Sequence, residues 1–171
     1  WNALYDEFQA VDLIRQLEEG TPYPLKGMVA FGLNAKMLPQ SEHLLKAMAD
    51  NLDFYVDTDI FMTMSAKYAD LVLPACSSLE RGEMKAYQGG FLTFTQPVIE
   101  PLYESKSDTD IMYGMIKALK LDDDLLQQGY EACCDWIIDG CGLTVADLKK
   151  SSLPVKVPTA KWPAQAGKVL A

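Results

Sequence analysis

The sequence has few of the residues from which common metal and nucleophile motifs are built. Its four cysteines stand at positions 76, 133, 134 and 141 without a Cys-x-x-Cys pair, so it contains neither a zinc motif nor a cysteine-ligated iron–sulfur motif. His43 is the only histidine and has no serine or cysteine partner in a recognisable nucleophile elbow, so the sequence supports no catalytic triad. Neither Gly-x-Gly-x-x-Gly nor the Walker A pattern occurs. The two commonest phosphate-binding loops are therefore absent from this sequence.

Long apolar runs are missing too, and positive charge is scarce. No apolar stretch approaches the roughly 18 residues that a membrane-spanning helix needs, so we expect no membrane segment in this sequence. With 15 basic and 24 acidic residues, the net charge is −9, which repels polyanions and argues against a nucleic-acid partner. A phosphate-bearing ligand would have to be held by backbone N–H groups, helix N-termini, hydroxyls or amides. Apolar residues make up 49% of the chain, which is enough for a hydrophobic core.

Short apolar runs alternate with helical patterns through the first two thirds of the chain. The patterns predict strands at 27–32, 54–56 and 71–73, and helices near 41–51, 62–69 and 108–119. This order is typical of βαβ units with right-handed crossovers. It predicts an α/β fold, in the form of a three-layer α/β/α domain with a mainly parallel sheet. The glycine-bounded first strand and the apolar third strand are both expected to be buried.

The remaining segments complete the predicted domain. Apolar residues recur at helical spacing over 2–19, and further helices are predicted at 122–139 and 144–150, the last with Thr144 as its N-cap. Residues 81–90 are polar and rich in glycine, which favours a loop, and 91–98 alternate as an edge or hairpin strand. We therefore expect one α/β domain over 1–150, followed by a linker or docking tail over 151–171.

Three short segments carry side chains that suit a ligand at the carboxyl edge of a parallel sheet. The first is Gly32-Leu33-Asn34, where glycine lets the backbone approach a ligand and the asparagine amide both donates and accepts. The second is Asp57-Thr58-Asp59, whose oxygens suit ribose hydroxyls or Mg²⁺. The third is Asp108, because a carboxylate can accept the parallel N1–H and N2–H bonds of guanine. Each also has a local explanation, as a turn residue or a helix cap.

Taken together, these segments resemble one protein family. GMVAFGLN, DFYVDTDIFMTMSAKYADLVLPA, the loop that begins at Glu80, and SKSDTDIM are similar to the molybdopterin oxidoreductase family, which includes formate dehydrogenases, dimethyl sulfoxide reductases and nitrate reductases. The likeness covers about residues 25–120. Ala35 stands where the family often has proline, and Gly90 stands where many members carry arginine.

The resemblance implies a fragment of a larger catalytic subunit whose α/β domain binds molybdopterin guanine dinucleotide with molybdenum. By motif, Gly32 and Asn34 would approach the dinucleotide, Thr58 and Asp59 would lie at its ribose and guanine end, and Asp108 would read guanine. The metal ligand and substrate pocket would lie outside this segment, as would any iron–sulfur cluster. Expected partners are the remaining domains of the parent subunit and electron-transfer subunits. Substrate and compartment, cytoplasmic or periplasmic in a prokaryote, stay open.

Two alternatives remain at this point. One is a molybdenum-free structural or electron-transfer subunit related to the large iron–sulfur subunit of respiratory complex I, which resembles the same fold. The other is a flavodoxin-like signalling domain that uses Asp57 and Asp59 to bind Mg²⁺, although no lysine follows a later strand to complete such a site. Asp108 separates the molybdenum-free subunit from the cofactor-binding one, since a cofactor-free relative has no need for a carboxylate that reads guanine.

Overall fold

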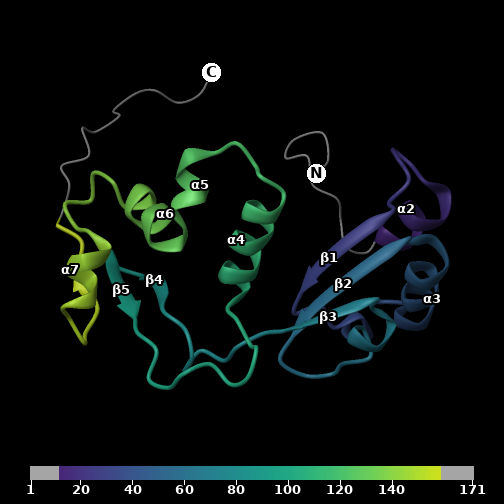
Figure 1. The fold of residues 1–171 in the computed structure, drawn as a ribbon, viewed down its shortest axis with the longest axis horizontal. Helices are drawn as coiled ribbons and strands as arrows, with labels where there is room; N and C mark the ends of the chain where they lie inside the picture. The colour runs from purple at the N-terminus through teal and green to yellow at the C-terminus, as the bar shows by residue number, and fades with distance from the viewer. Residues whose placement is uncertain (1–11, 159–171) are drawn as a thin grey trace. The chain divides into compact units, whose positions relative to one another are not determined.

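The computed structural model describes residues 12–158 and divides the chain into two compact units, with the division after Ala75 (Figure 1). The first unit is built on a parallel sheet and the second on an antiparallel one. Each unit has its own hydrophobic core. Among the described residues, no helix has the length and apolar character needed to cross a bilayer.

The first unit contains the parallel sheet that the sequence predicts. Its strands are β1 (Gly27–Phe31), β2 (Phe54–Asp59) and β3 (Leu71–Pro74), in the order β1-β2-β3. Both ladders are parallel. The α/β class is therefore confirmed, and all three expected strands are present close to their predicted positions.

Helices α2 (Leu13–Glu19) and α3 (Ser41–Asn51) form the core of this unit together with the sheet (Figure 1). The apolar stripe of α3 packs in one cluster with α2 and with the strand residues that share its side of the sheet. Buried members of this cluster include Leu13, Leu17, Ala30, Leu44, Leu45, Met48 and Tyr55. Helix α3 matches its prediction, whereas the part of the predicted helix 2–19 that precedes residue 12 lies outside the described residues.

Two expectations for this unit were wrong. Strands β1 and β3 are not fully buried, because Val29 is 39% and Leu71 46% exposed. When strands lie in the order 1-2-3, right-handed crossovers place both connections on the same face of the sheet. The described helices α2 and α3 cover that face, and the other face keeps exposed side chains. The predicted helix at 62–69 is reduced to a 3₁₀ turn, η3 (Ala66–Tyr68). There Thr63 Oγ1 accepts the Ala66 N–H at 3.2 Å, a local bond that competes with a longer helix.

The second unit begins with an antiparallel hairpin. Strands β4 (Glu83–Tyr87) and β5 (Phe91–Thr95) pair with each other, and β6 (Val155–Lys156) pairs with the other side of β5. The hairpin strand predicted near 91–98 is confirmed, but the predicted loop at 81–90 contains β4. The side chains of β4 (EMKAY) do not by themselves predict a strand. Pairing with β5 stabilises the extended conformation.

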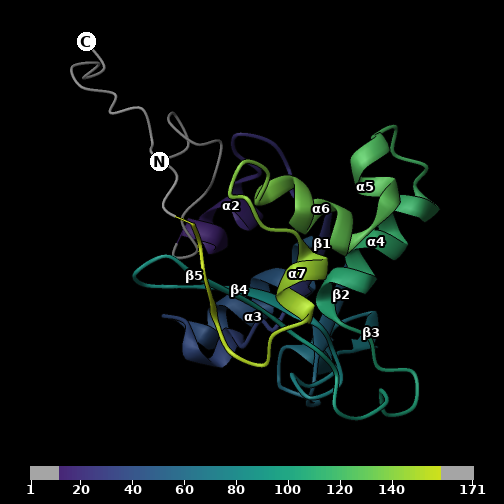
Figure 2. The same ribbon diagram turned by 90° about the vertical axis from the view of Figure 1, so that its left-hand side faces the viewer.

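Four helices accompany this hairpin (Figure 2): α4 (Asp108–Ala118), α5 (Asp124–Gln128), α6 (Tyr130–Ile137) and α7 (Val145–Lys149). The predicted helix at 122–139 is two helices, because the chain breaks at Gly129 with a φ of 95°. Thr144 caps α7 in a capping box with Asp147, as the sequence predicts. The core of the unit consists of Leu92, Phe94, Cys134, Ile138, Val145 and Leu148.

A single carboxylate fastens the loops of the second unit. Glu80 is 8% exposed and accepts the Ser77 N–H at 2.6 Å, the Leu102 N–H at 2.7 Å and the Ser105 hydroxyl at 3.4 Å. The hydrogen bonds from Ser77 and Leu102 favour the ionised form and lower the pKa of Glu80 to about 2. Glu80 thus joins the segment before β4 to the loop that follows β5.

We expect Glu80→Gln to lower the free energy of unfolding at pH 7, because an amide oxygen accepts these bonds more weakly than a carboxylate. The folded pKa, about 2, lies below the ordinary value of 4.5, so this stabilisation is present above pH 4.5 and is lost as the pH falls toward 2. Urea unfolding at several pH values should show the two proteins converge over that interval. Glu100→Gln, at an exposed glutamate, is the control. Equal stability of wild type and Glu80→Gln at pH 7 would contradict this role.

Candidate functional site

The carboxyl ends of the three parallel strands meet at one edge of the first unit. In the ladders Phe31 pairs with Thr58, and Asp59 pairs with Pro74. Residues that follow β1 therefore lie beside the last residues of β2. Of the predicted site residues, Gly32, Asn34, Thr58 and Asp59 are placed together at this edge, where open α/β sheets bind their ligands.

Gly32 forms the turn at the end of β1. Its N–H donates to the carbonyl oxygen of Thr58 at 2.8 Å, which extends the β1–β2 ladder by one bond. Its φ is +63°, a left-handed conformation that glycine adopts without strain. A Cβ added at this position would meet nothing within 4 Å. The backbone is thus open at this point, and the next two N–H groups, of Leu33 and Asn34, make no hydrogen bond within the described part of the chain.

The side chain of Asn34 has a local role. Its Oδ1 accepts the Lys36 N–H at 3.3 Å and caps the 3₁₀ turn η2 (Ala35–Met37). This is the turn-residue explanation that the sequence left open. The next residue, Ala35, makes a buried hydrogen bond: its N–H donates to Ser65 Oγ at 2.8 Å. Ser65 was missed by the sequence analysis, since its partner is 30 residues away in the chain and no local pattern marks it.

Near the end of β2, two buried polar side chains have no hydrogen-bond partner among residues 12–158. Asp57 and Thr58 are both 0% exposed, and both carboxylate oxygens of Asp57 and the Thr58 hydroxyl are unpaired among the described residues, as is the hydroxyl of Tyr55. Burial raises the pKa of Asp57, and the nearby charge of Asp59 raises it further. Buried polar atoms are usually paired. The Asp57 carboxylate oxygens can therefore accept hydrogen bonds from a group that the described residues do not provide.

Asp59 is half-buried and partly engaged. Its Oδ1 accepts the Phe61 N–H at 3.0 Å, and its carbonyl accepts the Ala75 N–H at 3.1 Å. The carboxylate therefore closes a turn directly after β2. It does not cap a helix, because no helix begins at this point of the described chain. Its second oxygen, Oδ2, makes no hydrogen bond with the described residues. The described residues contain no group of three or more His, Cys, Asp or Glu side chains that suits a metal ion.

Asp108 belongs to the second unit, in the first turn of α4. Ser107 caps this helix by accepting the Asp110 N–H at 3.0 Å. Asp108 Oδ2 lies 4.0 Å from Arg81 Nη1, and the Asp108 side chain is 42% exposed. Both residues line a small hollow of about 150 Å³ with Ser107, Thr109 and Tyr130. Arg81 was not singled out from the sequence, because only the fold brings it near α4.

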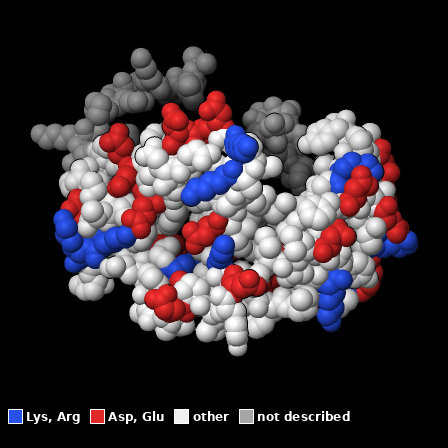
Figure 3. All heavy atoms as spheres, in the orientation of Figure 1, with Lys and Arg blue, Asp and Glu red and all other residues white. Residues whose placement is uncertain are grey.

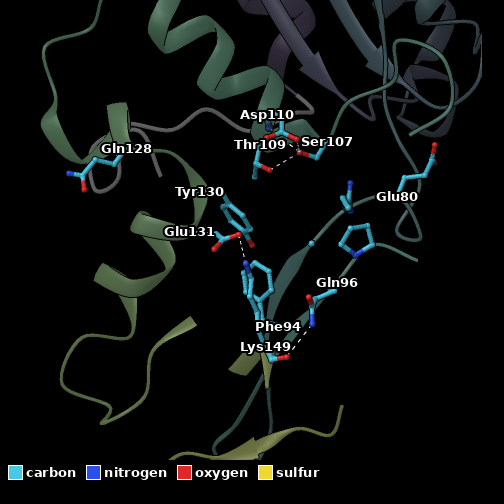
Figure 4. A pocket seen from close by; sticks show the side chains of 13 residues that line it. Glu80, Phe94, Gln96, Ser107, Thr109, Asp110, Gln128, Tyr130, Glu131 and Lys149 are labelled. Atoms are coloured by element: carbon cyan, nitrogen blue, oxygen red, sulfur yellow. Dashed lines mark hydrogen bonds and ion pairs between the residues drawn. The ribbon is translucent and has the colours of Figure 1, made fainter. Parts of the chain in front are cut away.

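A larger cavity shares residues with this hollow. It measures about 510 Å³ and is lined by Arg81, Ser107, Thr109 and Tyr130 together with residues of β5, α6 and α7 (Figure 4). Figure 4 shows Ser107, Thr109 and Asp110 joined in one hydrogen-bonded group, with Tyr130 and Phe94 on other walls. Lys149, which pairs with Glu131 at 2.5 Å, lies 5.0 Å from the centre of the Phe94 ring. The lining thus combines two cations with three carboxylates, together with hydroxyls and aromatic rings.

These features define an α/β unit with an open glycine turn at the carboxyl edge of a parallel sheet, the edge at which open α/β sheets bind ligands. Comparison with known proteins gives the family: a model of the molybdopterin oxidoreductase family matches residues 14–118, and the chain belongs to that family. Membership associates the chain with a molybdenum–pterin cofactor.

Individual relatives agree with this assignment. The chain is 31% identical over 134 residues to the probable oxidoreductase YoaE of Bacillus subtilis, a match that covers 77% of this chain and 20% of the relative. It is 31% identical over 90 residues to the trimethylamine-N-oxide reductase of Vibrio cholerae, covering 51% and 11%. Among solved structures, acetylene hydratase from Pelobacter acetylenicus matches with a TM-score of 0.70 and 26% identity, covering 89% of this chain and 21% of that one. The chain thus spans about a fifth or less of the length of these relatives.

Asp57 provides a direct test of the unpaired edge. We expect Asp57→Asn to raise the free energy of unfolding at pH 7 by on the order of 1 kcal/mol, because it removes a buried charge that accepts no hydrogen bond from the described residues. Since the folded pKa of Asp57 is raised, wild-type stability falls as the pH rises above the ordinary value of 3.8, and the gain should shrink toward that pH.

Urea unfolding between pH 4 and pH 8 measures this difference. Asp53→Asn is the matched control, because Asp53 is exposed and precedes the opposite end of the same strand. A variant less stable than wild type at pH 7 would show that Asp57 is paired in solution.

Proposed function

We propose that this chain is the part of a molybdenum-dependent oxidoreductase that holds one molybdopterin guanine dinucleotide. Family membership over residues 14–118 supports the cofactor class, and matched relatives are named as reductases of dimethyl sulfoxide, trimethylamine N-oxide and thiosulfate. Because those relatives are much longer, the proposal concerns a parent catalytic subunit of which this chain supplies one wall. When bound, the molybdenum centre supplies the redox chemistry, and the residues described here bind and orient the dinucleotide.

The Gly32 turn is the observation that carries the proposal. The structure leaves open space where a Cβ would stand, and the N–H groups of Leu33 and Asn34 make no hydrogen bond with described residues. Backbone N–H groups at such a turn are suitable donors for phosphate oxygens, and a chain with a net charge of −9 has few cations for that task. The residues of this turn therefore fit the diphosphate part of a dinucleotide.

The adjoining end of β2 fits the ribose. Ribose hydroxyls are hydrogen-bond donors, and Asp59 Oδ2 is an acceptor without a partner among the described residues. The buried and unpaired Thr58 and Asp57 side chains lie in the same strand immediately before it. We propose that Asp59 accepts from the ribose, that Thr58 supports this position, and that the Asn34 amide group lies beside the dinucleotide while its Oδ1 caps η2.

Asp108 is proposed to select guanine. Guanine presents N1–H and N2–H side by side, and a carboxylate accepts both, whereas adenine has no such pair of donors. Asp108 borders a hollow, and its nearest cation, Arg81, is 4.0 Å away, too far for a hydrogen bond. Its carboxylate therefore makes no hydrogen bond with Arg81 and can accept from a base.

Elemental analysis of the parent protein tests the assignment. Purified parent protein should contain molybdenum, and after oxidation it should release the fluorescent pterin. Mild acid treatment should also release guanosine monophosphate in equal amount. A parent protein without molybdenum and pterin would favour the molybdenum-free subunit related to complex I. Pterin without guanine nucleotide would refute the guanine dinucleotide form.

Gly32→Ala tests the open turn. The added Cβ strains a left-handed backbone and occupies the space proposed for the diphosphate, so a loss of about 1.4 kcal/mol would lower cofactor affinity about tenfold. Gly27→Ala is the matched control: it lies at the other end of the same strand, where an added Cβ would also meet no atom within 4 Å, and it has no left-handed φ. Pterin per mole of folded parent protein is the readout. Equal pterin content in the two variants would show that the turn does not contact the cofactor.

Asp108→Asn tests guanine selection. Asparagine has the same shape but offers only one acceptor oxygen, so it cannot accept both guanine donors. We expect the content of bound guanine nucleotide to fall several-fold, while the exposed control Asp122→Asn keeps the wild-type content. Unchanged nucleotide content in Asp108→Asn would leave this aspartate with its helix-terminal role alone.

A further inference from the structure

The loop between β5 and α4, whose path is drawn in Figures 1 and 2, carries a set of exposed large apolar side chains. Tyr103 is 101% exposed, Val98 72% and Leu102 61%, and Ile99 and the adjoining Leu79 are also exposed. We call these five residues the apolar loop. Single exposed apolar residues are common, but a contiguous group in one loop marks an interaction surface.

The apolar loop is held in shape by the protein. The Val98 and Ile99 N–H groups both donate to the Leu79 carbonyl, at 2.8 and 3.3 Å. The Leu102 N–H donates to the buried Glu80 carboxylate at 2.7 Å. Tyr103 follows with a φ of +54°, an uncommon conformation for a residue with a side chain. A loop fixed in advance loses little conformational entropy when it binds, which favours docking.

The charges around the apolar loop indicate what it contacts. Glu100 and Glu104 are exposed on either side of Leu102 and Tyr103. Acidic side chains at the rim of an interface favour basic side chains on the partner, while the apolar centre favours an apolar groove. Tyr103 adds an exposed hydroxyl that can donate a hydrogen bond to an acceptor on a partner. On the face shown in Figure 3, acidic and basic side chains are interspersed.

We propose that the apolar loop docks into an apolar groove bordered by Lys and Arg on a further domain of the same parent chain. The matched relatives provide the reason for this choice of partner, since the chain covers only 20% of YoaE and 11% of the Vibrio cholerae reductase. Neighbouring domains of one chain are present at a high effective concentration, so they bind such a surface more readily than a separate protein does. The inference uses the parent chain of the proposed function but does not depend on which cofactor it binds.

Chemical modification of Tyr103 tests the contact. In native parent protein, acetylation of tyrosine by N-acetylimidazole should be at least about tenfold slower at Tyr103 than in the urea-unfolded protein, as measured by peptide mass spectrometry, whereas the loop by itself gives this fully exposed side chain no protection. Reaction at the unfolded rate would overturn the proposal. Protection that disappears on dilution would assign the contact to a second copy and would also overturn it.

A charge substitution provides an independent test. Leu102→Glu should lower the melting temperature of the parent protein by several degrees, because it places a carboxylate in the apolar groove. Leu119→Glu is the matched control, as Leu119 is 66% exposed in the same unit but outside the apolar loop. Equal effects of the two variants, or no effect of Leu102→Glu, would overturn the proposal. Molybdenum and pterin content is measured in parallel, so failure of the proposed function is seen separately.

Discussion

The parallel pairing of β1 with β2 is the interaction on which the site depends. Its register aligns Phe31 with Thr58, and the Gly32 N–H continues the ladder to the Thr58 carbonyl at 2.8 Å. A slip by one residue would turn every side chain of one strand to the opposite face. The ladder therefore fixes both where the chain turns after β1 and which β2 side chains lie beside that turn.

The same edge concentrates polar atoms that the described residues do not pair. Asp57 and Thr58 are fully buried without a partner, although most buried polar groups in proteins have one. Such an arrangement costs stability, and natural proteins keep it mainly where function requires it. Their position one strand away from the open Gly32 turn supports the proposal that a dinucleotide binds at this edge.

The second unit shows the opposite use of a carboxylate. Glu80 accepts three hydrogen bonds, and its pKa is lowered to about 2, whereas burial without partners raises the pKa of Asp57. Ionised Glu80 stabilises the folded protein, whereas ionised Asp57 destabilises it. Glu80 also connects the two inferences about this unit, because it holds the apolar loop and precedes Arg81, the neighbour of Asp108.

Local patterns were sufficient to predict the elements whose determinants lie within a few residues. The stripe of α3, the three parallel strands and the Thr144–Asp147 capping box depend on spacing along the chain, and all are present. The positions of Gly32 and Asn34 after β1, and of Thr58 and Asp59 at the end of β2, follow from the same patterns. Their grouping at one edge follows from the rule that parallel strands align their carboxyl ends.

Only the tertiary structure decided which groups are paired and which faces are covered. β4 forms because β5 pairs with it, Ser65 meets the Ala35 N–H across 30 residues, and Arg81 approaches Asp108 although the β4–β5 hairpin lies between them in the chain. The exposure of Val29 and Leu71 depends on which face the crossovers cover. Each of these results requires contacts between distant segments. Sequence spacing encodes local conformation and the order of elements, whereas burial and hydrogen-bond pairing are set by what the folded chain brings together.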